Sequence, residues 1–150
     1  MVPRAIDGVL VTVRRGAMSM SIGLTFPLMI ATGSVGLLET SSTELEAAKH
    51  NLRSLLLSNK GERLVHFTMG ADLRRLLFEP LDVDDLRSRV VDSVSAQVER
   101  WMPYITIDKV DVLLRGEHDG PAIDTEAAVR VSFKFVNKPN IRGTVEVLVA

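Results

Sequence analysis

The chain has 150 residues, of which 46% are hydrophobic and 25% are charged, and its formal net charge is −1. A chain of this length is ordinarily one domain with a real core, and the near-zero charge argues against nucleic acid as a main partner, because phosphate binding needs clustered Lys and Arg. The absence of cysteine excludes disulfides, thiolate zinc sites and cysteine nucleophiles, and it fits a protein made in a reducing cytoplasm.

The first part of the chain contains short extended segments. Valines alternate within residues 9–13, which predicts a short strand in an N-terminal arm of residues 1–21. Residues 16–38 carry no charge, but four glycines and a proline interrupt them, whereas a membrane span needs about 20 predominantly apolar residues. They also lack the cleavage pattern of a signal peptide. We therefore expect two short extended pieces or a loose hairpin within 23–38, and no membrane association.

A strong helix start follows at Thr43. Thr43 and Glu46 form a capping-box pattern, in which the Thr hydroxyl accepts from a first-turn amide and the Glu reaches back. An apolar stripe at helical spacing then continues to about Ser58, and Gly61 is expected to stop the helix. The residues of this stripe are Leu45, Ala48, Leu52, Leu55 and Leu56.

Two further helices are predicted before the strands. A short helix spans 71–78 and ends at Pro80, because the residue before a proline is pushed out of helical angles. The third begins at the aspartates of 82–85, which suit the positive end of the helix dipole, and it ends before Pro103. Its apolar stripe consists of Val83, Leu86, Val90, Val94, Val98 and Trp101.

From residue 105 onward the apolar period changes to two, which is typical of strands. Strands are predicted at 105–114, 127–135 and 144–149, and the three-residue step from Ile107 to Val110 predicts a bulge. Helices followed by a meander of strands indicate an α+β fold, with three helices packed on one face of a small antiparallel sheet. We expect a single domain over residues 22–150.

The sequence offers no catalytic constellation. His50, His66 and His118 are not spaced in a metal-ligand motif, and serine-nucleophile, phosphate-loop and dinucleotide motifs are absent. Carboxylates are abundant, but sequence spacing alone selects no acid–base pair, so a hydrolase stays a distant third option. We expect a protein that is not an enzyme and that binds no metal, cofactor or small-molecule ligand.

The chain's single Trp and single Tyr, Trp101 and Tyr104, stand on either side of Pro103. In the simpler interpretation Trp101 closes the core and Pro103 stops the helix. In the second, which is compatible with the first, residues 101–104 form part of a docking face, because Trp and Tyr are common interface anchors.

Residues 61–80, GERLVHFTMGADLRRLLFEP, resemble a signature of the baseplate wedge and sheath-initiator family of contractile-tailed phages, phage-tail-like particles and a type VI secretion relative. In that family a Gly-Glu-Arg step leaves the first long helix, and a glycine opens a helix that ends in Leu-Phe-Glu-Pro. Residues 23–42 resemble the family's Gly-x-x-Phe-Pro segment, and residues 101–105 fall where it has an aromatic-Glu-Pro-Arg-Val segment. These features occur in family order over residues 22–112. Some family members carry a lysozyme-like label, which no residue here supports.

The resemblance implies a small structural subunit that docks on a bundle of larger wedge subunits beside the central tube. Met102 and Tyr104 replace the family's Glu and Arg, and Thr68 with Met69 replaces an acidic and aromatic pair, so docking here would use apolar and aromatic contacts or matched changes in the partner. The residues implied for this docking are Glu62, Arg63, Trp101, Met102, Pro103 and Tyr104.

The last predicted strand offers a second contact, because an exposed edge is a template for another chain. We hypothesise that the tail sheath protein pairs with this strand, although an edge that serves only this domain is the alternative. Its residues are Thr144, Val145, Glu146, Val147, Leu148 and Val149.

Together these points predict a component of a virion tail baseplate, assembled in the host cytoplasm, that initiates sheath assembly. The expected partners are larger wedge subunits and the sheath protein, with tube or hub proteins as further candidates. The alternative is a cytoplasmic adaptor of the same fold that binds a secretion or regulatory partner.

Overall fold

The structure is a computed structural model that describes residues 21–30, 38–77, 79, 82–114 and 127–149. The predicted strand at 9–13, with the rest of residues 1–20, lies outside this range. In the described part of the chain, no helix is long and apolar enough to cross a membrane. The elements are β1 (Gly23–Leu24), β2 (Thr40–Ser41), α1 (Glu44–Leu57), α2 (Leu73–Leu77), α3 (Val83–Trp101), β3 (Ile105–Leu114), β4 (Ala127–Phe135) and β5 (Arg142–Val149).

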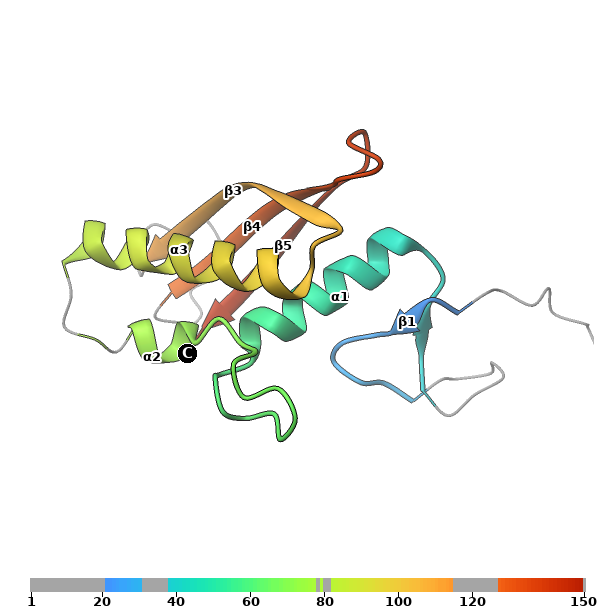
Figure 1. The fold of residues 1–150 in the computed structure, drawn as a ribbon, viewed down its shortest axis with the longest axis horizontal. Coiled ribbons are helices and arrows are strands. Elements are labelled where there is room, and N and C mark those ends of the chain that lie inside the picture. Colours follow the sequence, from blue (N-terminus) through green and yellow to red (C-terminus); the bar gives the residue numbers. More distant parts are fainter. Residues whose placement is uncertain (1–20, 31–37, 78, 80–81, 115–126, 150) are drawn as a thin grey trace, which may run out of the picture.

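The predicted α+β fold is confirmed (Figure 1). Strands β3, β4 and β5 form an antiparallel meander with β4 in the centre. Among the described residues three helices lie on one side of this sheet, where α1 packs against β5, α3 packs against β3, and α2 packs against α3. A second small sheet pairs β1 with β2 beside the start of α1.

The core lies between the helical layer and one face of the sheet. Val129, Val131 and Phe133 of the central strand are fully buried, while the residues between them face the other side and are partly exposed. Burying one such side chain stabilises the fold by about 1.5–3 kcal/mol. The register of β3 against β4 shifts between Ile107 and Lys109, which confirms the predicted bulge.

Helix α1 begins as predicted, because the Glu46 N–H donates to the Thr43 hydroxyl over 3.2 Å. Its end differs from the prediction. The chain leaves helical angles at Ser58 (φ −81°, ψ 137°), so Gly61 is not the stop. Gly61 instead has φ +91° and turns the loop that follows.

The junction between α1 and α2 is held by both long helices. The Gly70 N–H donates to the Oε1 of the buried Gln97 in α3 over 3.2 Å. The next residue, Ala71, donates its N–H to the Leu55 carbonyl (3.3 Å) and accepts from the Ser93 hydroxyl (2.7 Å). These bonds satisfy buried backbone groups that would otherwise cost free energy.

Glycine is required at position 70. Its φ is +132°, and a Cβ placed there would lie 2.4 Å from the Ser58 carbonyl oxygen. Asp72 also has a positive φ, +55°, so helix α2 cannot begin before Leu73. The predicted start of this helix at residue 71 is therefore wrong, and its predicted last residue, Phe78, lies outside the described residues.

We predict that Gly70→Ala destabilises the protein far more than Gly61→Ala. The first change adds a backbone clash to an unfavourable φ, roughly 1–3 kcal/mol for each effect. Gly61 also has a positive φ, but nothing lies within 4 Å of a Cβ there, so about 1 kcal/mol is expected. Thermal unfolding followed by circular dichroism measures both, and equal melting temperatures for the two variants would contradict the close approach.

Candidate protein-docking surfaces

The predicted docking residues Glu62 and Arg63 lie in the loop between α1 and α2, which projects from the domain (Figure 1). The Glu62 carboxylate accepts hydrogen bonds from the Asn59 backbone N–H (2.9 Å) and from the Asn59 side-chain amide (2.6 Å). Arg63 donates to the Ser54 hydroxyl over 2.8 Å. Both side chains therefore shape the loop in this structure.

These hydrogen bonds hold the pKa of Glu62 below its ordinary value of 4.5. The backbone N–H of Asn59 is the main cause, followed by the Asn59 side chain, and nearby Arg63 and Arg74 lower the pKa further. Each of these groups favours the ionised carboxylate. Glu62 is thus an anion at neutral pH that is already engaged by its own loop.

The tip of this loop is closed by its own backbone and carries apolar side chains. The Gly61 N–H donates to the Phe67 carbonyl over 2.8 Å, which draws the two ends of residues 61–67 together. Leu64, Val65 and Phe67 are nevertheless 86%, 81% and 60% exposed. Sequence reasoning did not single out these three residues, although large apolar side chains between Gly61 and Gly70, outside any predicted helical stripe, were a signal.

Trp101 joins this loop from the end of α3. Its ring meets the His66 ring edge-on at a centroid distance of 4.9 Å, and the Arg100 guanidinium lies 5.4 Å from its centre. Its indole Nε1 is buried and has no hydrogen-bond partner among the described residues. The structure therefore brings Trp101 to the loop that contains Glu62 and Arg63.

The other predicted docking residues lie elsewhere. Met102 is 4% exposed and belongs to the core, while Pro103 is exposed. Tyr104 is 40% exposed, its ring stacks on Phe135 at 6.3 Å, and its hydroxyl accepts from the Asn51 side-chain amide over 3.3 Å. It lines a hollow of about 420 Å³ between α1 and the β4–β5 turn, so Trp101 and Tyr104 face different parts of the surface.

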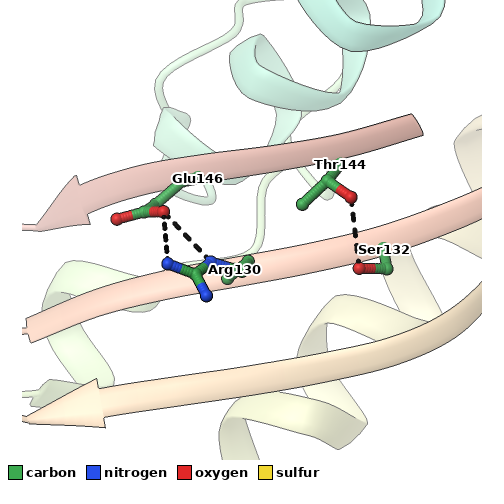
Figure 2. Close-up of polar contacts among 4 residues, drawn as sticks. All are labelled: Arg130, Ser132, Thr144 and Glu146. Carbon is green, nitrogen blue, oxygen red and sulfur yellow. Dashed lines mark hydrogen bonds and ion pairs between the residues drawn. The ribbon is translucent and has the colours of Figure 1, made fainter. Parts of the chain in front are cut away.

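The predicted sheath-pairing strand, β5, has its two faces in different environments. Val145, Val147 and Val149 face the core, whereas Thr144, Glu146 and Leu148 face away from the helices. Figure 2 shows how the outer face is tied to β4: Arg130 bonds Glu146 through Nε (3.1 Å) and Nη2 (2.9 Å), and the hydroxyls of Ser132 and Thr144 lie 3.3 Å apart. Such cross-strand pairs stabilise a sheet by roughly 0.2–1 kcal/mol each and fix its register.

The backbone of β5 is paired on one side. Within the described residues its neighbour is β4 alone. The Phe135 N–H donates to the Ile141 carbonyl over 3.3 Å, which marks this as a hydrogen-bonded pair. Because such pairs alternate along an antiparallel ladder, the backbone N–H and C=O groups of Thr144, Glu146 and Leu148 point away from β4.

The opposite edge of the sheet, β3, is less suited to pairing. It carries the bulge after Ile107, and ion pairs link Lys134 to Asp108 and Lys109 to Asp111, each over 2.7 Å. Bulges and charges are the usual devices that protect an edge strand. The register of β5 against β4 is regular throughout, so β5 is the better suited of the two edges.

The histidines that the structure describes have packing contacts. His50 Nδ1 accepts from the Phe26 N–H over 3.0 Å and holds the β1–β2 segment to α1, and His66 packs on Trp101. His118 lies outside the described residues. In the part of the chain that the structure describes, no group of three or more His, Asp or Glu could hold a metal ion.

Comparison with known proteins gives two kinds of match. A family model described as baseplate wedge protein gp25 matches residues 42–140, whereas no curated protein sequence matches. The fold is similar to a Geobacter sulfurreducens protein described as a candidate tail lysozyme, with a TM-score of 0.58, 13% identity, and coverage of 75% of this chain and 96% of that one. It is also similar to a chain in the cryo-EM structure of the anti-feeding prophage baseplate, with a TM-score of 0.53, 16% identity, and coverage of 85% and 84%. At these identities the solved structures support the fold alone.

The Glu62 hydrogen bonds predict a titration. Because the pKa in the folded state is lowered, their contribution to stability is present above the ordinary pKa and is lost as the pH falls through the lowered one. Carboxyl NMR should give a midpoint below 4.5, and Asn59→Ala, which removes the side-chain donor, should raise it part of the way. A midpoint at or above the ordinary value would contradict the loop geometry.

Proposed function

Because the chain belongs to the baseplate wedge protein gp25 family and is therefore a structural component of a tail baseplate, we propose that it docks on larger wedge subunits and initiates assembly of the tail sheath. Assembly with other baseplate proteins follows from the family; the sheath and the larger wedge subunits as partners, and assembly in the host cytoplasm, are parts of the proposal. The name of the lysozyme-like neighbour applies to that protein, and the family is a structural one. We treat residues 22–150 as one domain that follows an arm of residues 1–21.

The observation that carries the sheath proposal is the regular, outward-directed backbone edge of β5. Backbone N–H and C=O groups that are directed outward from a regular edge can give a partner strand main-chain hydrogen bonds, which supply affinity in strand addition. The outer-face pairs Arg130–Glu146 and Ser132–Thr144 support the register of β5 against β4. A sheath strand could then extend the meander without disturbing the core.

Docking on the wedge subunits would use two separate parts of the surface. One is the loop with Glu62 and Arg63 together with the Trp101 ring that packs on it through His66. The other is formed by Pro103 and Tyr104, with Met102 as their buried support. Exposed aromatic rings held by packing are effective anchors because they lose little conformational entropy on binding.

The sheath proposal predicts that Leu148→Pro blocks sheath assembly while Leu148→Ser does not. Position 148 is exposed and its N–H points away from β4, so proline removes a donor that has no backbone acceptor among the described residues, and proline is tolerated on strand edges. Serine keeps the N–H and serves as the matched control. Circular dichroism checks folding, and electron microscopy scores sheathed particles. Normal sheaths with the folded Leu148→Pro variant would refute strand addition at β5.

The wedge proposal predicts that Tyr104→Ala weakens copurification with wedge subunits at least fivefold, because truncating an aromatic anchor typically costs more than 1 kcal/mol of binding. Asn51→Ala is the control, since it removes the hydrogen bond to the Tyr104 hydroxyl and leaves the ring in place. Thermal unfolding shows whether each variant is folded. Unchanged binding by a folded Tyr104→Ala would remove this residue from the docking surface.

A further inference from the structure

The loop tip, residues 61–67, is an apolar surface that is left largely exposed within the domain. Leu64 and Val65 stand almost entirely in solvent and Phe67 is more than half exposed. The chain is described without a gap from residue 38 to 77, so the loop and both elements that carry it are in view. Side chains of this kind on a projecting loop mark an interaction surface more often than a packing failure.

The tip is also held in one shape before any partner binds. The Gly61–Phe67 backbone bond closes it, the Glu62–Asn59 and Arg63–Ser54 bonds fix its first half, and His66 rests on the Trp101 ring. Preorganisation of this kind reduces the conformational entropy lost on binding. The loop tip can therefore present its apolar side chains to a partner in a fixed shape.

The charges around the loop tip indicate which charge a complementary partner surface would carry. Three guanidinium groups surround the tip: Arg63 and Arg74 act on Glu62, and Arg100 lies over the Trp101 ring. The Glu62 carboxylate is already bonded by Asn59, and the neighbouring carboxylates Asp72 and Glu99 line other hollows of the surface. The surroundings of the loop tip are thus mainly cationic, and a complementary partner surface would be acidic.

We propose that the loop tip inserts Leu64, Val65 and Phe67 into an apolar groove, rimmed by carboxylates, on a larger wedge subunit. This inference rests on the proposed function and deepens it: the three apolar side chains make the contact, and Glu62 and Arg63 hold the loop that presents them. Trp101 at the end of α3 packs on His66 of this loop, so the same surface continues onto α3.

Two other occupants fit the observations less well. Three side chains on a chain of net charge −1 give little attraction to an anionic bilayer, where stable binding needs a larger apolar face or a polybasic segment. A second copy of this chain is also disfavoured. The hollows on its described surface, such as the one lined by Glu44 and Lys138, carry both signs of charge rather than an acidic rim.

The test uses the full chain, tagged and co-expressed with the tail proteins of the same particle. Leu64→Ser with Val65→Ser should reduce its incorporation into baseplates at least tenfold and leave the melting temperature unchanged, because both side chains are exposed. Leu28→Ser with Ile30→Ser, two exposed apolar positions in the segment between β1 and β2, is the matched control and should enter normally. Val65→p-benzoylphenylalanine, irradiated within the particle, should cross-link to a wedge subunit at a site flanked by Asp or Glu.

The outcomes separate this inference from the function on which it rests. An unmodified chain that enters no tail particle would refute the proposed function and the inference with it. Normal entry of both the unmodified chain and the double serine variant would refute the loop assignment alone. A cross-link to the sheath or to a second copy, or sedimentation of the unmodified chain with phosphatidylglycerol vesicles that the serine variant loses, would also overturn the inference.

Discussion

The close approach of Gly70 to the end of α1 is the constraint on which the helical layer depends. Helices α1 and α3 touch each other little directly, and the short segment at Gly70 and Ala71 is bonded to both. Only a residue without a Cβ can pass the Ser58 carbonyl at this distance. The junction thus couples the helix that covers β5 to the helix that covers β3.

The same constraint explains why the loop projects. Ser58 and Gly70 lie in contact, so the residues between them must leave the surface and return to it, as in a compact surface loop. Leu64 and Val65 lie near the middle of this loop, between its two anchored ends, and the rest of the domain leaves both side chains exposed. Their exposure is a consequence of the backbone path, and the short hydrogen bonds within the loop keep that path fixed.

The edge of the sheet at β5 is a second candidate docking surface, distinct from the loop tip. The inner face of the sheet is buried by helices, and its outer face carries paired polar side chains (Figure 2). Of the two edges of the sheet that the structure describes, β5 is the one with an uninterrupted register. The loop tip and the β5 edge belong to different elements, so one chain could contact a wedge subunit and a sheath strand at the same time. A family whose members are baseplate components provides the setting in which such a bridge would be useful.

The sequence by itself determined the three helices, the three strands of the meander and their order, because caps and periodicity are local properties: the start at Thr43 and the bulge after Ile107 were both readable from spacing. It also carried the family resemblance in residues 61–80. It did not locate β2, which lies at Thr40–Ser41, outside the range 23–38 expected for the extended pieces. Only the tertiary structure decided where α2 begins, which side of the domain Tyr104 faces, and that Met102 is buried. These properties depend on contacts between segments distant in the chain, since what packs against a residue, and not its type, sets its exposure.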